Sequence, residues 1–274
     1  MKKAIIGFVI LLGIIVIDGY INQKYIVETE YNLSTDKVDD NYTFAQISDY
    51  HSSTNENEQI YEILDSNQPD YIILSGDILE SEDMEPTVDF ISKLTGYGTV
   101  IYSRGNHDDD YNSYQQFLES IKELGVIVVG DSSYQVGDLN FIGIEDFSGA
   151  NLVAKEPFTS TYTNYISNYQ DYVQEDKYNI LLGHRPSFLE AYSNIDVDLV
   201  FSGHAHGGQW QFPFTDIGFI APDDGIFTNQ VHGLKQEADT TQIISSGTSN
   251  PYEPFIPRLF NRKEVVIVNL SSKQ

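Results

Sequence analysis

Reactive side chains recur in short clusters along this chain of 274 residues, and each cluster directly follows a run of apolar residues. The clusters combine imidazole, carboxylate and amide groups, and most of them contain a glycine. They are Asp49-Tyr50-His51, Gly76-Asp77, Gly105-Asn106-His107-Asp108, Gly183-His184-Arg185 and Gly203-His204-Ala205-His206. Imidazole nitrogens combined with carboxylate and amide oxygens suit manganese, iron or zinc better than calcium or a thiophilic ion.

The candidate metal ligands in these clusters are Asp49, His51, Asp77, Asn106, His184, His204 and His206. This set is larger than one tetrahedral site needs, and it fits two divalent ions about 3.5 to 4 Å apart that share a carboxylate. His204 and His206 flank one alanine, and on a tight loop this spacing directs two imidazoles to two different metals. The chain has no cysteine, which excludes thiolate ligands and thiolate nucleophiles.

The segments that carry the clusters alternate between strand and helix patterns. Residues 42–48, 71–74 and 99–103 have strand character, and apolar residues at helical spacing follow each of them, which is typical of a parallel α/β arrangement. The second half is richer in strands, near residues 125–129, 133–136, 139–144, 178–182, 198–201, 241–245 and 264–270. A helix is expected over about 161–174. We therefore predict an α/β fold of two packed mixed β-sheets flanked by helices, with the clusters converging at the carboxyl ends of the strands.

In this order, the five clusters resemble the signature of the calcineurin-like metallophosphoesterase family, over roughly Thr43 to His206. Further segments are similar to the membrane-anchored bacterial branch of that family: Gly207-Gly208-Gln209, Val231-His232-Gly233, Gly247-Thr248 and Arg258-Leu259-Phe260-Asn261-Arg262. The resemblance implies a four-layer α/β/β/α sandwich. It also implies hydrolysis of a phosphodiester or pyrophosphate bond, because relatives in that branch include enzymes that act on nucleotide-linked lipid precursors.

The resemblance further implies a role for each site residue. Asp49, His51 and His206 would hold one metal, Asn106, His184 and His204 the other, and Asp77 would bridge the two. A metal-bridging hydroxide would attack phosphorus, with His107 assisting the leaving group and Asp108 holding the His107 ring. General-acid help of this kind is typically worth about 10² to 10⁴ in rate. The alternative is a catalytically degenerate module at the cell surface that binds metal or phosphate without turnover.

The formal net charge of −26 disfavours nucleic acid as a partner, and the chain has no basic stripe that would read a phosphate backbone. The predicted metal centre has a local charge of the opposite sign to the net charge of the chain. Two divalent ions bring +4, while two carboxylates and a hydroxide remove three, which leaves about +1 at the centre. A small or lipid-linked phosphate ester is therefore the expected substrate, and the sequence leaves the oligomeric state open.

Three further residues are candidate substrate contacts. Arg104 and Arg185 adjoin cluster residues and have the planar, bidentate geometry that suits phosphate oxygens. Each could instead pair with one of the many acidic side chains. His232 is expected at the rim of the site, although a lone histidine in a loop is more often incidental.

The N-terminus resembles a membrane-targeting segment. Lys2 and Lys3 precede an unbroken apolar run from Ala4 to Ile17, which Asp18 ends. The run is shorter than the ~20 residues that usually span a bilayer, but its flanks extend it to a thin span. We predict a signal anchor over 1–21, a polar acidic linker over 22–41 and a catalytic domain over 42–274. This organisation implies a single-pass protein of the cell membrane whose catalytic domain is extracytoplasmic, and the alternative is secretion after cleavage.

An aromatic-rich segment follows the last histidine cluster directly, with Trp210, Phe212, Phe214 and Phe219 among its residues. It has two interpretations. One is an apolar lip for a lipid-linked substrate. The other, which we favour from the sequence, is a buried loop core.

Overall fold

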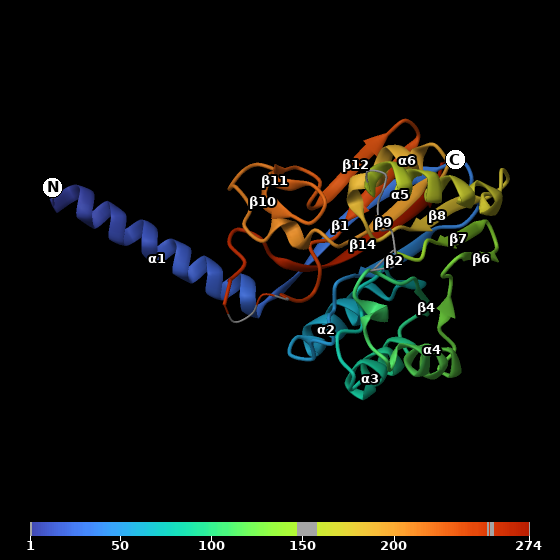
Figure 1. Ribbon diagram of the computed structural model, residues 1–274, viewed down its shortest axis with the longest axis horizontal. Coiled ribbons are helices and arrows are strands. Elements are labelled where there is room, and N and C mark those ends of the chain that lie inside the picture. The colour runs from blue at the N-terminus through green and yellow to red at the C-terminus, as the bar shows by residue number, and fades with distance from the viewer. Residues whose placement is uncertain (1, 147–157, 251, 253–254, 274) are drawn as a thin grey trace.

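Figure 1 shows the computed structural model, in which helix α1 (Lys2–Lys24) projects from a body built of two β-sheets. The structure describes residues 2–146, 158–250, 252 and 255–273. Within these ranges, α1 is the one helix that is long and apolar enough to cross a membrane, a criterion of length and composition alone.

The two sheets each contain six strands, and both are mixed. The first has the order β1-β14-β2-β3-β4-β5, formed by Ile26–Thr35, Lys263–Ser272, Tyr42–Ile47, Tyr71–Leu74, Thr99–Tyr102 and Ile127–Val128. The second has the order β12-β13-β9-β8-β7-β6, formed by Gly233–Glu237, Thr240–Ile244, Leu199–Ser202, Tyr178–Leu182, Leu139–Gly143 and Ser132–Val136. A separate hairpin joins β10 (Gly218–Ala221) to β11 (Gly225–Thr228).

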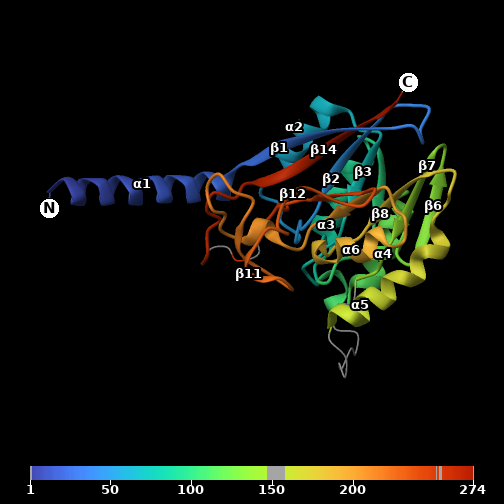
Figure 2. The ribbon, with the colours of Figure 1, turned by 90° about the horizontal axis from the view of Figure 1, so that it is seen from above.

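Helices cover the outer face of each sheet, which confirms the predicted fold class (Figure 2). The first sheet packs on α2 (Asn57–Asn67), α3 (Glu85–Leu94) and α4 (Tyr114–Glu123), and the second on α5 (Phe158–Ile166) and α6 (Leu189–Ser193). Alternate residues of β3 show why its run is apolar throughout: Ile72 and Leu74 face the helices, whereas Ile73 faces the other sheet. A strand buried on both faces has no polar side to present.

The strand directions place the cluster loops and the end of α1 at the same end of the first sheet. β2, β3 and β4 are parallel, so their carboxyl ends lie together. β14 is antiparallel to β2, and β1 is parallel to β14. β1 therefore begins, directly after α1, at the end where β2 finishes.

Residues 26–35 correct the predicted linker. The sequence predicts a linker over 22–41, whereas the structure has a ten-residue strand, β1, paired with β14 along its whole length. Its alternate side chains are exposed, since β1 forms the edge of the sheet, and this is why its composition resembles that of a linker. The sheet therefore starts at Ile26 and not at Tyr42.

The aromatic segment after residue 209 is also different from the favoured prediction of a buried core. Trp210 is 39% exposed, Phe212 is 40% exposed and Phe214 is fully exposed. The reason is that the β10–β11 hairpin pairs with neither six-stranded sheet and has only a small buried cluster beneath it, formed by Ala205, Ala221 and Val231.

Candidate metal centre

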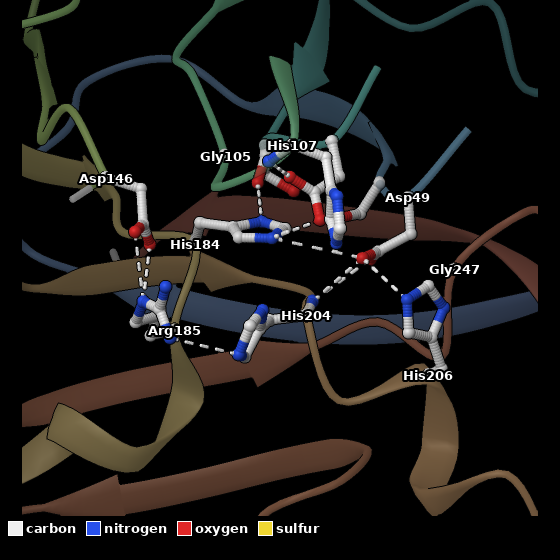
Figure 3. Close-up of polar contacts among 12 residues, drawn as sticks. Asp49, Gly105, His107, Asp146, His184, Arg185, His204, His206 and Gly247 are labelled. Carbon is white, nitrogen blue, oxygen red and sulfur yellow. Dashed lines mark hydrogen bonds and ion pairs between the residues drawn. The ribbon is translucent and has the colours of Figure 1, made fainter. Parts of the chain in front are cut away.

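Six of the seven predicted metal ligands fall into two buried groups. Group A comprises Asp49, His51 and His206, and group B comprises Asp77, His184 and His204. Within each group the possible ligand atoms all lie within 4.8 Å of one another. The residues follow β2, β3, β8 and β9, so each group takes side chains from both sheets (Figure 3). The packing of one sheet on the other thus assembles the site.

Two carboxylates lie between the groups. Asp77 Oδ2 is 3.1 Å from His184 Nε2 in group B and 4.0 Å from His51 Nε2 in group A. Asp49 Oδ1 is 3.6 Å from His206 Nε2 and 4.0 Å from His184 Nε2. Both carboxylates therefore reach ligands of the two groups, as a shared ligand must.

Glycines let the backbone approach these carboxylates. A Cβ on Gly105 would lie 2.2 Å from Asp77 Oδ1, and one on Gly203 would lie 2.2 Å from Asp49 Oδ2. The close approach allows the His107 backbone N–H to donate to Asp77 at 2.8 Å and the His204 backbone N–H to donate to Asp49 at 3.0 Å. These bonds hold both carboxylates in place from behind.

Two imidazoles contact other residues through Nδ1, which leaves their Nε2 atoms facing the centre. His184 Nδ1 donates to the Ser75 carbonyl oxygen at 2.8 Å, since a carbonyl can only accept. His51 Nδ1 lies 2.5 Å from Glu80 Oε2. Such outer contacts fix the ring orientation and tautomer of metal-binding histidines.

The residues fit a metal because several of their buried polar atoms have no hydrogen bond among the described residues. They are His51 Nε2, Asp77 Oδ2, Asn106 Oδ1, His184 Nε2 and His206 Nδ1. Although Asp77 Oδ2 and His184 Nε2 are 3.1 Å apart, they are not aligned as donor and acceptor. Unpaired polar atoms are costly in a protein interior, and divalent cations at the two groups would give such atoms a partner. The amide oxygen of Asn106, the seventh predicted ligand, is one of these buried atoms without a hydrogen bond.

The histidines of the centre differ in protonation state in the absence of metal. Burial acts to lower the pKa of His51, but Glu80 outweighs it and raises that pKa. Burial acts to lower the pKa of His184, but Asp77 outweighs it and raises that pKa to about 10. Burial likewise acts to raise the pKa of Asp77, and His184 nevertheless holds it well below its usual value. In group A, burial and the neighbouring His51 lower the pKa of His206 well below its ordinary value. His206 is therefore neutral, whereas His184 is an imidazolium beside a carboxylate.

Comparison with known proteins identifies the family. The sequence profile described as calcineurin-like phosphoesterase matches residues 42–208, which include every ligand of both groups. The chain belongs to the calcineurin-like phosphoesterase family. An uncharacterized metallophosphoesterase of Campylobacter jejuni is 28% identical over 75% of this chain and 52% of its own length. YkuE of Bacillus subtilis, also an uncharacterized metallophosphoesterase, is 25% identical over 92% of this chain and 88% of its own.

The fold of the phosphoesterase is similar to the crystal structure of TT1561 from Thermus thermophilus, with a TM-score of 0.51 at 11% identity over 75% of this chain and 89% of that one. The chain spans about half the length of the first curated relatives it matches, at 52%, 48% and 48%. Family membership and the two ligand groups together indicate a metal-dependent phosphoesterase.

Asp108 does not hold the His107 ring as the resemblance implies. Its buried carboxylate accepts backbone N–H groups from Asp77, Ile78, Leu79 and Gly105 at 2.7 to 2.9 Å. It thus ties the loop after β3 to the loop after β4. Because these four N–H groups occupy the buried carboxylate, Asp108 is held away from the His107 ring.

His107 lies at the rim of the centre. Its side chain is 43% exposed, and its ring centroid is 5.5 Å from that of His51. The carboxylate beside it belongs to Asp110, whose Oδ2 is 3.6 Å from His107 Nδ1. This position leaves His107 Nε2 free of the Asp110 contact.

The two predicted substrate arginines pair with acidic side chains, which is the alternative that the sequence left open. Arg185 Nε contacts Asp146 at 2.8 and 3.0 Å (Figure 3), and its Nη1 contacts Asp223 at 2.5 Å. Arg104 pairs with Asp109 and lies 3.4 Å from Glu145. Arg185 is buried, and its Nη1 also lies 3.2 Å from His204 Nε2, so it touches a predicted ligand directly.

His232, the third predicted substrate contact, is half-buried. It follows Val231, which packs with Ala205 between the two histidines of the β9 loop. Among the described residues, no hydrogen bond or ion pair joins His232 to either ligand group. The structure thus places it near the centre without bringing it into contact with a ligand.

Several residues that position the site were not predicted. Asp223 Oδ2 lies 3.1 Å from His204 Nε2, and Arg185 and His204 lower the pKa of this carboxyl to about 2 against the effect of burial. Buried Arg258 donates to the carbonyl oxygens of Ser246 and Ser249, and Ser249 Oγ donates to the Asp49 carbonyl oxygen at 2.7 Å. A sequence signal existed only for Arg258, which lies in a family-like segment.

Proposed function

We propose that this phosphoesterase hydrolyses a phosphodiester or pyrophosphate bond in a small or lipid-linked phosphate ester. Groups A and B would each hold one divalent ion, of manganese, iron or zinc, with Asn106 completing group B and Asp77 shared. The observation that carries the proposal is the position of Asp77 Oδ2, within 4.0 Å of imidazoles in both groups. When bound, such ions neutralise phosphoryl charge and lower the pKa of a water molecule.

The chain's own residues supply orientation and a proton. The backbone N–H groups of His107 and His204 fix the carboxylates of Asp77 and Asp49. The His107 ring is partly exposed beside the ligands, with Asp110 near Nδ1, so Nε2 is the atom that would donate a proton to the leaving oxygen. Arg185, held by Asp146 and Asp223, adds positive charge behind group B.

The test combines metal analysis with two substrates. The full chain, purified in detergent and loaded with each metal in turn, is assayed on bis-p-nitrophenyl and mono-p-nitrophenyl phosphate. The expected result is two metals per chain and faster hydrolysis of the diester. Two bound metals without hydrolysis of either ester would favour the degenerate binding module, and absence of bound metal would overturn both interpretations.

The proposal also includes the cellular location of the catalytic domain. We infer that α1 is a signal anchor that holds the catalytic domain at the outer face of the cell membrane, and secretion after cleavage is the alternative. Support comes from the apolar run of α1 with Lys2 and Lys3 before it. Protease added to intact cells should digest the catalytic domain. Full protection of the domain would place it in the cytoplasm and contradict this topology.

A further inference from the structure

Large apolar side chains gather on one surface of the protein, which we call the aromatic face. It consists of Trp210, Phe212, Phe214, Ile220, Phe227 and Phe255, whose exposed fractions are 39%, 40%, 107%, 49%, 57% and 89%. Ring contacts connect it through Phe219, which lies 5.4 Å from Trp210 and 5.7 Å from Phe227 between centroids. Trp210, Phe212 and Phe227 line one groove, and Trp210 and Ile220 line an adjoining one. Phe214 and Phe255 directly neighbour Pro213 and Ile256, which line the same two grooves. An exposed apolar surface of this kind marks an interaction site.

The aromatic face adjoins helix α1. Ile15 of α1 lines one apolar groove together with Trp210, Phe212 and Phe227. Exposed apolar side chains of α1 therefore continue directly into those of the aromatic face. Whatever apolar medium surrounds α1 at the level of Ile15 also borders the aromatic face.

Hydrogen bonds fix the helix to the body, so the aromatic face keeps its place beside α1. Asp18 Oδ2 accepts the backbone N–H of Phe260 at 2.6 Å. Gln23 Oε1 accepts Asn250 Nδ2 at 2.6 Å and the backbone N–H of Arg258 at 3.3 Å. The last turns of α1 are thus part of the folded body, and no free linker separates the two.

The apolar run of α1 is shorter than the hydrocarbon core is thick, so the folded body should lie close against the membrane. From Ala4 to Ile17 a helix rises only about 21 Å, whereas the hydrocarbon core of a bilayer is about 30 Å thick. If Lys2 and Lys3 remain at one interface, Asp18 is drawn to the hydrocarbon boundary at the other. A short span is accommodated by thinning of the bilayer or by burial of flanking residues. The groove at Ile15, one turn before Asp18, then lies at the level of the lipid.

We propose that the aromatic face docks into the interface of the bilayer that α1 enters. Trp and Phe rings are typical of apolar faces that are buried at the boundary between headgroups and acyl chains. Asp216, an exposed carboxylate on this segment, has Lys235 Nζ 3.7 Å away, which reduces its charge at the headgroups. With a net charge of −26 on the chain, the fitting lipid is zwitterionic, such as phosphatidylcholine.

Docking in this way directs the metal centre to the lipid headgroups. His206 lines a cleft with Gln209, Ile220 and Tyr252. The last three of these also line the adjoining groove with Trp210. The cleft therefore opens along the aromatic face. This consequence rests on the proposed function, whereas the docking itself does not depend on hydrolysis.

The single tryptophan of the chain, Trp210, is a built-in reporter of docking. The full chain is placed, one copy per disc, in phosphatidylcholine nanodiscs with or without bromine on the acyl chains. Brominated lipid should quench Trp210 emission at least twofold, and aqueous iodide should quench it little. A control chain with Trp210→Phe and Tyr97→Trp moves the reporter to the amino end of β4, where brominated lipid should have no effect.

Paired variants separate docking from mere proximity to α1. Phe214→Ser with Phe255→Ser should at least halve the lipid quenching of Trp210, while Phe214→Leu with Phe255→Leu should preserve it. Both sites are exposed, so far-UV circular dichroism should match the parent chain. Equal lipid quenching in the two pairs, or free access of iodide to Trp210 in the parent, would overturn the proposal. If quenching is absent but Trp210 emission depends on protein concentration in detergent, a second copy covers the face and the bilayer does not.

Discussion

Groups A and B are built from the same kinds of side chain, two imidazoles and one carboxylate, yet His206 and His184 differ in proton state. His206 in group A is kept neutral by burial and by His51. His184 in group B is kept protonated by Asp77, with its pKa raised to about 10, and Glu80 likewise raises the pKa of His51 in group A. The difference teaches that one imidazole of group A is ready for metal, whereas His184 in group B must first release a proton.

Asp77→Asn should have the largest effect on both groups, because Asp77 reaches both of them and raises the pKa of His184. We expect loss of measurable diester hydrolysis and a lower metal content, measured by mass spectrometry of the dialysed protein. Asp110→Asn, a matched change beside His107, should retain both metals. Activity that persists in full after Asp77→Asn would falsify the shared-ligand assignment.

His107→Ala should separate metal binding from catalytic turnover. Its ring is at the rim and outside both groups, so two metals should remain bound while turnover falls by about 10² to 10⁴. Asn112→Ala, on the same loop, is the control for disturbance of the backbone. Loss of metal from His107→Ala would count against its role as a proton donor.

Glu80→Gln tests group A by itself, because Glu80 contacts His51 in group A and no ligand of group B among the described residues. Loss of an outer partner typically weakens metal binding by about 10- to 100-fold. Titration with zinc should show this loss for one metal only. An equal loss for both metals would mean that the groups do not bind independently.

The pH dependence of metal binding follows from His184. Because its pKa is raised to about 10, metal must displace a proton from it at neutral pH. Affinity for the second metal should therefore fall about tenfold for each unit that the pH decreases below that value. In the metal-free protein, the His184–Asp77 pair stabilises the fold fully below the ordinary histidine pKa, and this contribution is lost as the pH rises through about 10. Thermal unfolding of chelator-treated protein measures the second effect.

The sequence predicts the ligands well because strand-end loops carry them. Each apolar run was recognisable, and parallel strands bring the loops that follow them to one edge of a sheet. Asp49 and Asp77 could be placed together for this reason alone, whereas His184 follows β8 of the second sheet and reaches them only because the two sheets pack on each other. The partners of these residues could not, because Glu80 and Asp223 owe their positions to loops whose course no periodicity encodes.

Two segments were misassigned, for different physical reasons. β1 is an edge strand whose exposed positions carry polar and acidic residues, so its composition resembles that of a solvated linker. The aromatic segment after residue 209 resembles a core because aromatic side chains are usually buried. Only the pairing of β10 with β11, away from both large sheets, shows that it is a surface.

Metal stoichiometry tests the central claim most directly. Parent chain, His184→Ala and His206→Ala are loaded with manganese, dialysed, and analysed for metal and for diester hydrolysis on the same samples. The two-group account predicts two metals in the parent, one in each variant, and hydrolysis only in the parent. A single metal in the parent that either substitution removes would contradict it.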